Sequence, residues 1–448
     1  MSARFVRLLI VRPNAVRFTT GGMATFRVFA GFNREFGLPN AQVVLIGQHK
    51  NVANLAFDDL LAEKLKGVGK ENFEAALKRL QPGGSSVPLF LDLAKVLTVS
   101  DEVGRNNAPS NAIALQKKLA GLEAVADVKN LSLVLYAQFE HVLASVSAVA
   151  RAFPLYSRKT KKAGFESVHL EVVVSDGKKL AAKDVQFLQS LVDSIRKCQE
   201  QVDKPCNELH SEAFAEEAEQ LVDSLNAGGE ELLKRGFGGI YHVGKAARHP
   251  PVFACFSYTP ANASESYALV GKGIVYDTGG MQIKGKTAMP TMKVDMGGAA
   301  ALLGAFCTLV KSGFQQDLHC LLCIAENAVV RVRQIPLVHP RQQRTEIEQE
   351  AIKAGKKSGD LVHPLPYAPE LHFASNLKSA VADMKNTNLS GRAVAGLFIG
   401  AHVDFPQDVA WLHVDMAGCV LASDRATGYG VALVCQLLSK HLDVDLTK

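Results

Sequence analysis

Apolar runs of strand length alternate with segments of helical periodicity along most of this 448-residue chain. Residues 41–48 and 165–174 are runs of the first kind, and residues 71–80 and 139–153 repeat apolar side chains at helical spacing. Strands that alternate with helices favour a sheet with helices packed on its faces. Because 48% of the residues are hydrophobic, the chain can also bury a large core. The sequence therefore predicts an α/β fold.

Length alone predicts two or three domains, at roughly 150 residues each. The pattern favours an N-terminal α/β domain over residues 1–180 and a C-terminal domain over residues 181–448, which begins with a linker helix at 181–200. In the second domain we expect strands at 251–258, 267–277, 319–328 and 409–418, and helices at 211–225, 297–310, 393–403 and 430–442. Because strands and helices alternate there, its sheet is expected to be mostly parallel and covered on both faces.

The charge balance argues against several classes of partner. The 50 Lys+Arg and 44 Asp+Glu residues are spread along the chain without a long basic block. We therefore expect no nucleic-acid partner and no membrane partner. A basic nucleic-acid-binding protein would rest only on the pI of about 8.8, since basic and aromatic residues are not interleaved. No run of about 18 uncharged apolar residues is present, so no membrane-spanning helix is expected.

The eight cysteines are scattered and lie mostly in apolar runs. This usage favours buried free thiols in a reducing compartment over a disulfide framework. The closest pair, Cys320 and Cys323, has no second ligand pair at matching spacing. A buried strand is therefore favoured over a structural zinc site at this pair.

Residues 1–34 hold six arginines and no acidic residue. This composition is typical of an organelle transit peptide, and Met23 offers an alternative start. The other interpretation is an ordinary first strand at 4–11 with basic flanks. We expect a cytoplasmic protein, with a mitochondrial location as the alternative.

Three charged residues, Lys272, Asp277 and Asp295, lie within 24 residues around the end of one predicted strand. Ligands of open α/β sheets bind beyond the carboxyl ends of strands, and the glycines at 279–280 let the backbone approach a ligand. A charged lysine in an apolar strand is costly unless it is paired, or neutral and bound to a metal. The three residues together therefore indicate a site for a hard cation.

Each of these residues also has a purely structural interpretation. Asp295 stands just before a predicted helix and would be its N-cap, a contribution of about 1 kcal/mol. Lys272 and Asp277 would form a buried ion pair. Lys284 would be a solvated surface lysine rather than a residue of the same cleft. The convergence of three charges at one sheet edge favours cation binding over these alternatives.

The blocks around these residues resemble the signature blocks of the leucyl (cytosol) aminopeptidases, which are two-metal exopeptidases, and within them the animal aminopeptidase-like branch. The resemblance is carried by VGKGIVYDTGGMQIK and MKVDMGGAAA, preceded by GFGGIYHVGKAA and followed by GDLVHPLPYAPELHF, SAVADMKN and DRATGYGVALV. It covers most of residues 180–448 and, more weakly, the N-terminal domain. It implies a C-terminal metallopeptidase domain that acts on peptide substrates and a homo-oligomer, a hexamer in that family.

The resemblance also implies a role for each residue. Lys272, Asp277 and Asp295 would be metal ligands, with Asp277 touching both ions; the ions would be zinc or manganese, with magnesium as a further option. Lys284 would be the catalytic lysine that polarises the scissile carbonyl. Met292 would line the pocket for the first side chain of the substrate. In that family two divalent ions share a water or hydroxide that attacks the peptide carbonyl.

The chain departs from the family pattern after residue 327. The family signature Asn-Thr-Asp-Ala-Glu-Gly-Arg, which supplies two carboxylate ligands and an arginine, is missing together with a following core strand and loop. The stretch NTNLSGR at 386–392 has neutral groups where the carboxylates belong, so we interpret it as a loop. One ion therefore keeps three of its four protein ligands and the other keeps only Asp277. At most one ion is expected to bind.

Two functions remain open from the sequence. The first is a metal-dependent aminopeptidase whose full-length form releases N-terminal residues from peptides, and the incomplete site leaves open whether this chain is itself an enzyme. The second is an inactive family member, a pseudoenzyme or shortened isoform, that acts through oligomerisation or partner binding. An incomplete gene prediction would produce the same sequence. Metal content and peptide turnover discriminate between the two functions.

Overall fold

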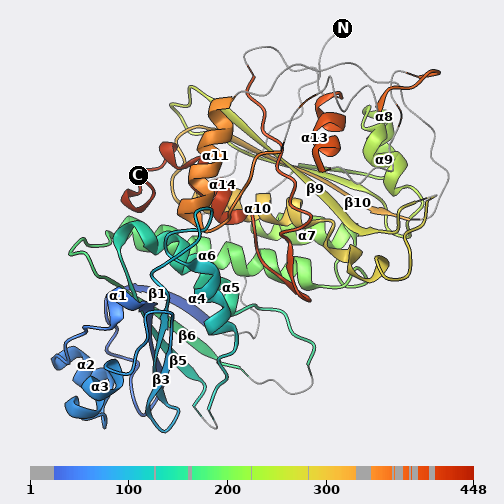
Figure 1. Cartoon of the computed structure of the whole chain (residues 1–448). Helices are drawn as coiled ribbons and strands as arrows, with labels where there is room; N and C mark the ends of the chain where they lie inside the picture. The colour runs from blue at the N-terminus through green and yellow to red at the C-terminus, as the bar shows by residue number, and fades with distance from the viewer. Residues whose placement is uncertain are drawn as a thin grey trace.

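The computed structural model of the protein describes residues 25–125, 128–159, 164–222, 225–280, 282–328, 345–365, 368, 377–382, 385, 392–402 and 409–448. The described residues form two main sheets on either side of a long central helix, α6 (Ala182–Asp203) (Figure 1). This arrangement confirms the mixed α/β fold that the sequence predicts. The strand considered at 4–11 and Met23 lie outside the described residues.

The first sheet has six strands in the order β1-β6-β5-β2-β4-β3. They are β1 (Thr25–Ala30), β2 (Gln42–Gln48), β3 (Ser86–Phe90), β4 (Ala94–Val99), β5 (Asn130–Ala137) and β6 (Ser167–Val174). All neighbouring strands are parallel except β3 and β4. The connection at 91–93 is too short for the crossover that parallel strands need, so β3 and β4 form an antiparallel hairpin.

Helices cover both faces of the first sheet. They are α1 (His49–Val52), α2 (Asp59–Lys64), α3 (Lys70–Leu77), α4 (Ala112–Ala120) and α5 (Val142–Ala152). Alternate residues of β2 enter different cores: Val44 and Ile46 belong to the core that contains α4 and α5, and Val43 and Leu45 to the core that contains α2 and α3. Every residue of β2 is buried, which explains its continuous apolar run.

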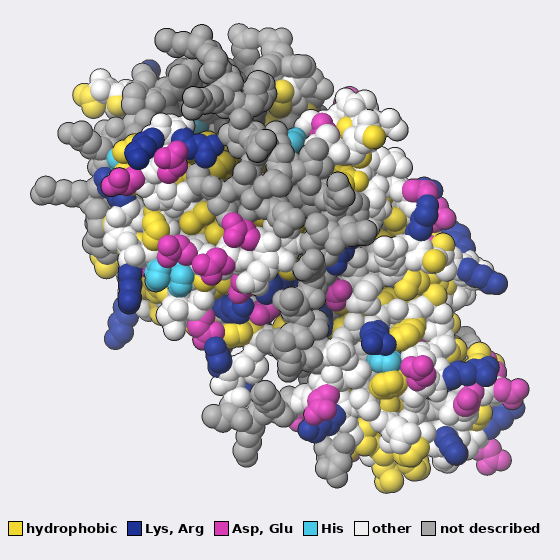
Figure 2. All heavy atoms as spheres, turned by 180° about the vertical axis from the view of Figure 1, so that it is seen from behind, with side chains coloured by type: hydrophobic (Ala, Val, Ile, Leu, Met, Phe, Trp, Pro, Cys, Tyr) yellow, Lys and Arg dark blue, Asp and Glu magenta, His cyan; other side chains and the backbone are white. Residues whose placement is uncertain are grey.

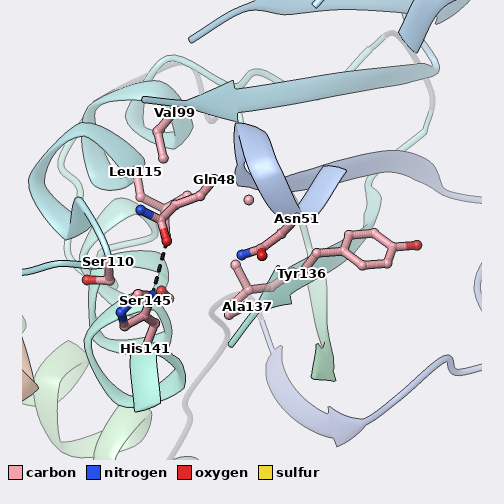
Figure 3. Close-up of a pocket in the computed structure, with 11 residues that line it drawn as sticks. Gln48, Asn51, Val99, Ser110, Leu115, Tyr136, Ala137, His141 and Ser145 are labelled. Carbon is pink, nitrogen blue, oxygen red and sulfur yellow. Dashed lines mark hydrogen bonds between the residues drawn. The ribbon is translucent and has the colours of Figure 1, made fainter. Parts of the chain in front are cut away.

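A small polar cavity lies where the carboxyl ends of β2 and β5 meet (Figure 3). Gln48 Oε1 lies 3.0 Å from His141 Nδ1, and Gln48 Nε2 donates to the backbone oxygen of Pro109 at 2.9 Å. Burial lowers the pKa of His141 and favours its neutral form. The chain order reverses between β2 and β5, which is where open α/β sheets place ligands. The volume of about 10 Å³, however, has room for about one water molecule only.

Helix α6 lies between the two sheets and packs on α5 and on α10 (Gly297–Lys311). Thr308 Oγ1 of α10 donates to Ser194 Oγ of α6 at 2.8 Å. A Cβ atom at Gly304 would lie only 3.2 Å from the backbone oxygen of Ser194. The two helices therefore cross at close range because small residues occupy the crossing.

The second sheet has the order β7-β8-β10-β9. Its strands are β7 (Leu225–Gly228), β8 (Val252–Tyr258), β9 (Ser266–Asp277) and β10 (Asp317–Asn327). Only β9 and β10 are parallel, and β8 is antiparallel to both β10 and β7. The expectation of a mostly parallel sheet is therefore wrong for the described strands. The connection at 259–265 is too short for a crossover, whereas α10 provides one between β9 and β10.

The remaining elements of the second half are α7 (Ser211–Leu221), α8 (Glu230–Lys234), α9 (Gly238–Gly244), α11 (Thr345–Ser358), α13 (Arg392–Gly400), α14 (Val431–Leu437), β11 (Leu421–Ala422) and β12 (Arg425–Ala426). The helices predicted at 211–225, 297–310, 393–403 and 430–442 correspond to α7, α10, α13 and α14. The strand predicted at 409–418 is wrong, because residues 409–416 have no regular structure. The side chains at 411–416 are all half-buried. The segment therefore lacks the alternation of buried and exposed residues that is typical of a strand packed on a core.

One segment of the described chain, Met289–Lys311, is long and apolar enough to span a membrane by length and composition alone. It contains α10, and 72% of its most apolar window is buried inside the protein. Helix α10 packs on β9, β10 and α6, so burial in the core accounts for its composition. On the face shown in Figure 2, acidic and basic side chains of the described residues are interspersed, in agreement with the small net charge.

A buried ion pair joins the two halves of the chain. Arg151 Nη2 of α5 donates to Asp360 Oδ1 at 2.6 Å, and both side chains are buried. Asp360 Oδ2 accepts hydrogen bonds from the backbone N–H groups of Gly430 and Leu433 at 3.0 and 3.1 Å, at the start of α14. Arg151 Nε donates to the backbone oxygen of Thr427 at 3.0 Å. Both buried charges therefore have the partners that burial requires.

Replacing Asp360 with alanine is expected to destabilise the protein by about 3–5 kcal/mol, because Arg151 would remain buried without a counter-charge. The midpoint of urea unfolding measures the effect. Lys183→Ala is the control, because it removes an exposed ion pair with Asp443 and such pairs contribute little. Equal midpoints for the two variants would contradict the role given to Arg151 and Asp360.

Candidate functional site

Strand β9 ends at Asp277, and the chain turns back at once. Gly279 has a φ of +89°, in the left-handed region that glycine adopts without strain. A Cβ atom at this position would lie 2.3 Å from the backbone oxygen of Gln282. The backbone N–H of Lys284 donates to the oxygen of Thr278 at 2.9 Å and closes the turn. The turn therefore needs glycine and returns Lys284 to the end of β9.

Three donors surround the carboxylate of Asp277. Its Oδ2 lies 2.8 Å from Lys284 Nζ, and its Oδ1 accepts from Asn327 Nδ2 at 2.6 Å and from the backbone N–H of Gly279 at 3.0 Å. Burial alone would raise the pKa of Asp277, but these donors outweigh burial and lower it. The carboxylate is therefore ionised at neutral pH and held in one orientation.

Lys272 and Asp295 form a second ion pair, with Lys272 Nζ 2.9 Å from Asp295 Oδ2. Burial raises the pKa of Asp295; the charge of Lys272 opposes this rise and the negative charge of Asp277 adds to it. Asp277 and Lys284 are close enough to influence the pKa of Asp295, so the two ion pairs are neighbours. The Lys272 side chain is 63% exposed, so this lysine is far less buried than its apolar strand suggests.

The structure differs in detail from each structural alternative considered for these residues, and their role as metal ligands stays a prediction. Asp295 does not cap α10, since the N-cap position is Met296 and no side chain caps that helix. Lys272 is paired with Asp295 rather than with Asp277. Lys284 is not a free surface lysine, because its ammonium group lies against Asp277. Four charged side chains therefore meet at the carboxyl end of β9.

Close packing fixes the segment that carries Asp295. A Cβ atom at Gly271 would lie 2.6 Å from the Cα atom of Ala299, so α10 touches β9 directly. The backbone N–H of Ile274 in β9 donates to the oxygen of Asp295 at 3.2 Å. The backbone at Asp295 is therefore anchored to the strand that carries Lys272.

Met292 lies on a 3-10 turn, Met289–Val294, that leads into Asp295, and its side chain is half-buried. Lys293 Nζ of this turn donates to the backbone oxygens of Val202 and Asp203 at the end of α6. The turn is thereby tied to the central helix. The two ion pairs, Lys272–Asp295 and Lys284–Asp277, do not involve Met292.

Asn327 is a residue of this site that the sequence analysis missed. It is the last residue of β10 and lies opposite Asp277 in the parallel register. Its backbone oxygen accepts from the N–H of Thr278 at 3.0 Å and from Thr278 Oγ1 at 2.6 Å. The sequence could have indicated Asn327, because it ends a predicted strand and the carboxyl ends of neighbouring parallel strands meet at one edge of the sheet. Asn327 therefore positions both Asp277 and the turn after it.

The donor set fits one hard divalent cation. Two carboxylates and one amine converge, and carboxylate oxygens are ligands for zinc, manganese and magnesium. Among the described residues, no trio of His, Cys, Asp or Glu side chains suited to a metal forms around Asp277 or Asp295. Residues 329–344 and 386–391, which include most of NTNLSGR, lie outside the described part of the chain. The described donors of this site are therefore two carboxylates and one amine, and the binding of a single ion stays a prediction.

Comparison with known proteins gives matches over most of the chain. The catalytic-domain model of the cytosol aminopeptidase family matches residues 196–332 and 341–435, and M17 aminopeptidase N-terminal domain 2 matches residues 41–162.

Leucine aminopeptidase 1 of Caenorhabditis elegans is 38% identical over 477 residues, covering 91% of this chain and 96% of that protein. The Homo sapiens probable aminopeptidase NPEPL1 is 36% identical, covering 89% and 90%. The structure of the C. elegans leucine aminopeptidase has a TM-score of 0.85 and 35% identity, covering 95% of this chain and 100% of that chain.

These matches also locate a gap. The match to the catalytic-domain family is interrupted at 333–340. The alignment with the C. elegans protein runs over 477 residues although this chain has 448, so it includes positions that this chain lacks. The interruption of the family match lies close to the departure from the family pattern that the sequence shows after residue 327.

Gly279→Ala is expected to destabilise the protein by about 1–3 kcal/mol, because the new Cβ would meet the backbone of Gln282 at a positive φ. The control is Gly285→Ala in the same loop, where no atom lies within 4 Å of the added Cβ and a change within about 0.5 kcal/mol is expected. Thermal unfolding of both variants measures the difference. If they melt at the same temperature, the turn is not constrained as described.

Proposed function

Because this chain belongs to the cytosol aminopeptidase family, we propose that it binds one divalent cation and the amino end of a peptide at the carboxyl end of β9. We propose further that it does not complete the peptide hydrolysis that the family resemblance implies. The first statement rests on the two ion pairs of Lys272, Asp277, Lys284 and Asp295, and the second rests on the missing signature.

In the proposed site Lys272, Asp277 and Asp295 are the ligands of the cation, which would be zinc or manganese, with magnesium as a further option. The two carboxylates supply hard oxygen donors. The amine of Lys272 would bind in its neutral form, which a neighbouring dication favours. Asn327 would keep Asp277 oriented through Oδ1, and Oδ2 would become a ligand once Lys284 is released from it. Residues that orient ligands in this way commonly contribute about 10–100-fold to metal affinity.

Lys284 is proposed as the residue that polarises the carbonyl of the first peptide bond. Its Nζ lies against Asp277 Oδ2. Release from Asp277 would free the ammonium group to donate to a carbonyl oxygen, and the closed turn keeps the Lys284 backbone in place for this exchange. Met292, on the adjacent 3-10 turn, is proposed to line the pocket for the first side chain.

Hydrolysis needs more than these residues supply. Paired divalent ions provide a nucleophilic water and a second Lewis acid in such sites. This chain offers a polarising lysine and ligands for one ion, but it lacks the signature that carries the further carboxylates and the arginine. If each lost group costs on the order of 10²-fold in rate, as single oxyanion-type deletions do, the combined deficit removes measurable turnover.

A family member that holds peptide ends without cleaving them would act through its oligomer or through a partner. The absence of the family signature from the sequence supports this second function. We propose a cytoplasmic homo-oligomer, with the hexamer of the family as the expected assembly. The family description supports the cytoplasmic location.

Purified protein is expected to bind at most one Mn²⁺ per chain, because only one set of ligands is assembled. Asp295→Asn is expected to abolish this binding, whereas Glu102→Gln, an exposed carboxylate in the first half of the chain, leaves it unchanged. Equilibrium dialysis with elemental analysis gives the stoichiometry. Two tightly held manganese ions would overturn the single-ion site.

The chain is expected to show no detectable hydrolysis of leucyl amides with added manganese, zinc or magnesium. Inserting the family signature with its following strand and loop after residue 327 is expected to restore turnover. The release of a chromogenic amine measures both. The opposite result is chelator-sensitive hydrolysis by the unaltered chain that Lys284→Ala abolishes and Lys286→Ala, at an exposed lysine of the same loop, does not.

A further inference from the structure

A second group of metal-type side chains lies outside the β9 site. His210 immediately precedes α7, Glu212 lies in its first turn, and His249 lies shortly before β8. One ligand atom of each residue lies within 4.8 Å of the ligand atoms of the other two. It is the one such group found among the residues that the structure describes.

The geometry of this group brings two imidazoles and a carboxylate together. The rings of His210 and His249 are stacked, with centroids 3.6 Å apart and planes inclined by 8°. His249 Nδ1 lies 2.8 Å from Glu212 Oε2. The lone pair of an imidazole nitrogen lies in the ring plane, so the two nearly parallel rings must rotate apart for both to coordinate one ion.

The backbone holds these side chains together without a metal. Ser211 is buried, and its Oγ donates to the backbone oxygen of Pro250 at 2.7 Å. This bond ties the start of α7 to the segment that carries His249. The side chains of His249 and Glu212 are 31% and 42% exposed, so an ion from solvent can reach them. The backbone therefore keeps the three side chains close together and accessible, and metal binding needs only side-chain rotation.

We propose that His210, Glu212 and His249 form a binding site for a divalent transition metal of the Zn²⁺ class. Imidazole nitrogens suit zinc, copper and nickel, whereas magnesium and calcium prefer oxygen ligands alone. Three protein ligands with water in the fourth position are a common zinc environment. The bound ion would fasten the start of α7 to the segment before β8. The proposal uses no residue of the β9 site and does not depend on the proposed function.

One hydrogen bond limits the affinity of this site. His210 Nδ1 accepts from the backbone N–H of Ala213 at 3.3 Å and caps α7. Coordination through Nδ1 would replace this bond, and coordination through Nε2 would move the ring proton to Nδ1 and break it. The bond is longer than the usual range for such hydrogen bonds, so its loss is a modest cost.

The test uses the full chain with Asp277→Asn and Asp295→Asn, so that the β9 site does not contribute. Titration calorimetry with Zn²⁺ is expected to show one site per chain. His249→Ala and Glu212→Gln are each expected to weaken binding at least about tenfold. His49→Ala is the matched control, because His49 is also half-buried beside a carboxylate, with Nδ1 3.9 Å from Asp101 Oδ2, but belongs to no trio. It is expected to leave the affinity unchanged.

A second readout separates coordination from a loss of folding. Zn²⁺ is expected to raise the melting temperature of the background protein and not that of its His249→Ala variant, and excess Mg²⁺ is expected not to displace the zinc. The proposal is overturned if the background protein takes up no zinc, if its binding survives His249→Ala, or if Mg²⁺ displaces the ion.

Discussion

The ion pair between Arg151 and Asp360 holds the two halves of the molecule in one arrangement, and the site at β9 depends on it through a series of contacts. The backbone oxygen of Arg151 accepts from Gln199 Nε2 of α6, and Asp203 at the end of α6 accepts from the backbone N–H of Ala426. The same end of α6 accepts from Lys293, two residues before Asp295. The charged groups of the site come from the second half of the chain. The first half holds α6 in place, and the turn before Asp295 is attached to the end of α6.

Local periodicity was sufficient to predict most helices and strands, because burial on one face imposes a repeat that the sequence must show. Strand direction was not predictable in the same way. The second sheet is mixed because the connection at 259–265 is short, and nothing in the alternation of apolar runs states which strands become neighbours. The segment 409–418 has the composition of a strand but no buried face in the structure, so composition alone misled.

The sequence singled out these charged residues because their spacing resembles a family motif, but it did not predict how they pair. The sequence suggested Lys272 with Asp277, whereas the structure pairs Lys272 with Asp295 and gives Asp277 to Lys284. Asn327 was missed since its contact with Asp277 joins positions 50 residues apart in the chain. The histidines at 210 and 249 were missed for the same reason, because only the folded chain brings them together.

The two lysine–aspartate pairs at β9 allow the site to fold before a metal ion binds. Two positive and two negative groups neutralise one another there, so the charges are compensated before any ion arrives. A site built from carboxylates alone would repel itself when empty and would make folding depend on the metal supply. The compensated charges at β9 carry no such repulsion, so the surrounding scaffold can fold whatever the supply of metal. Metal binding and folding therefore need not be lost together.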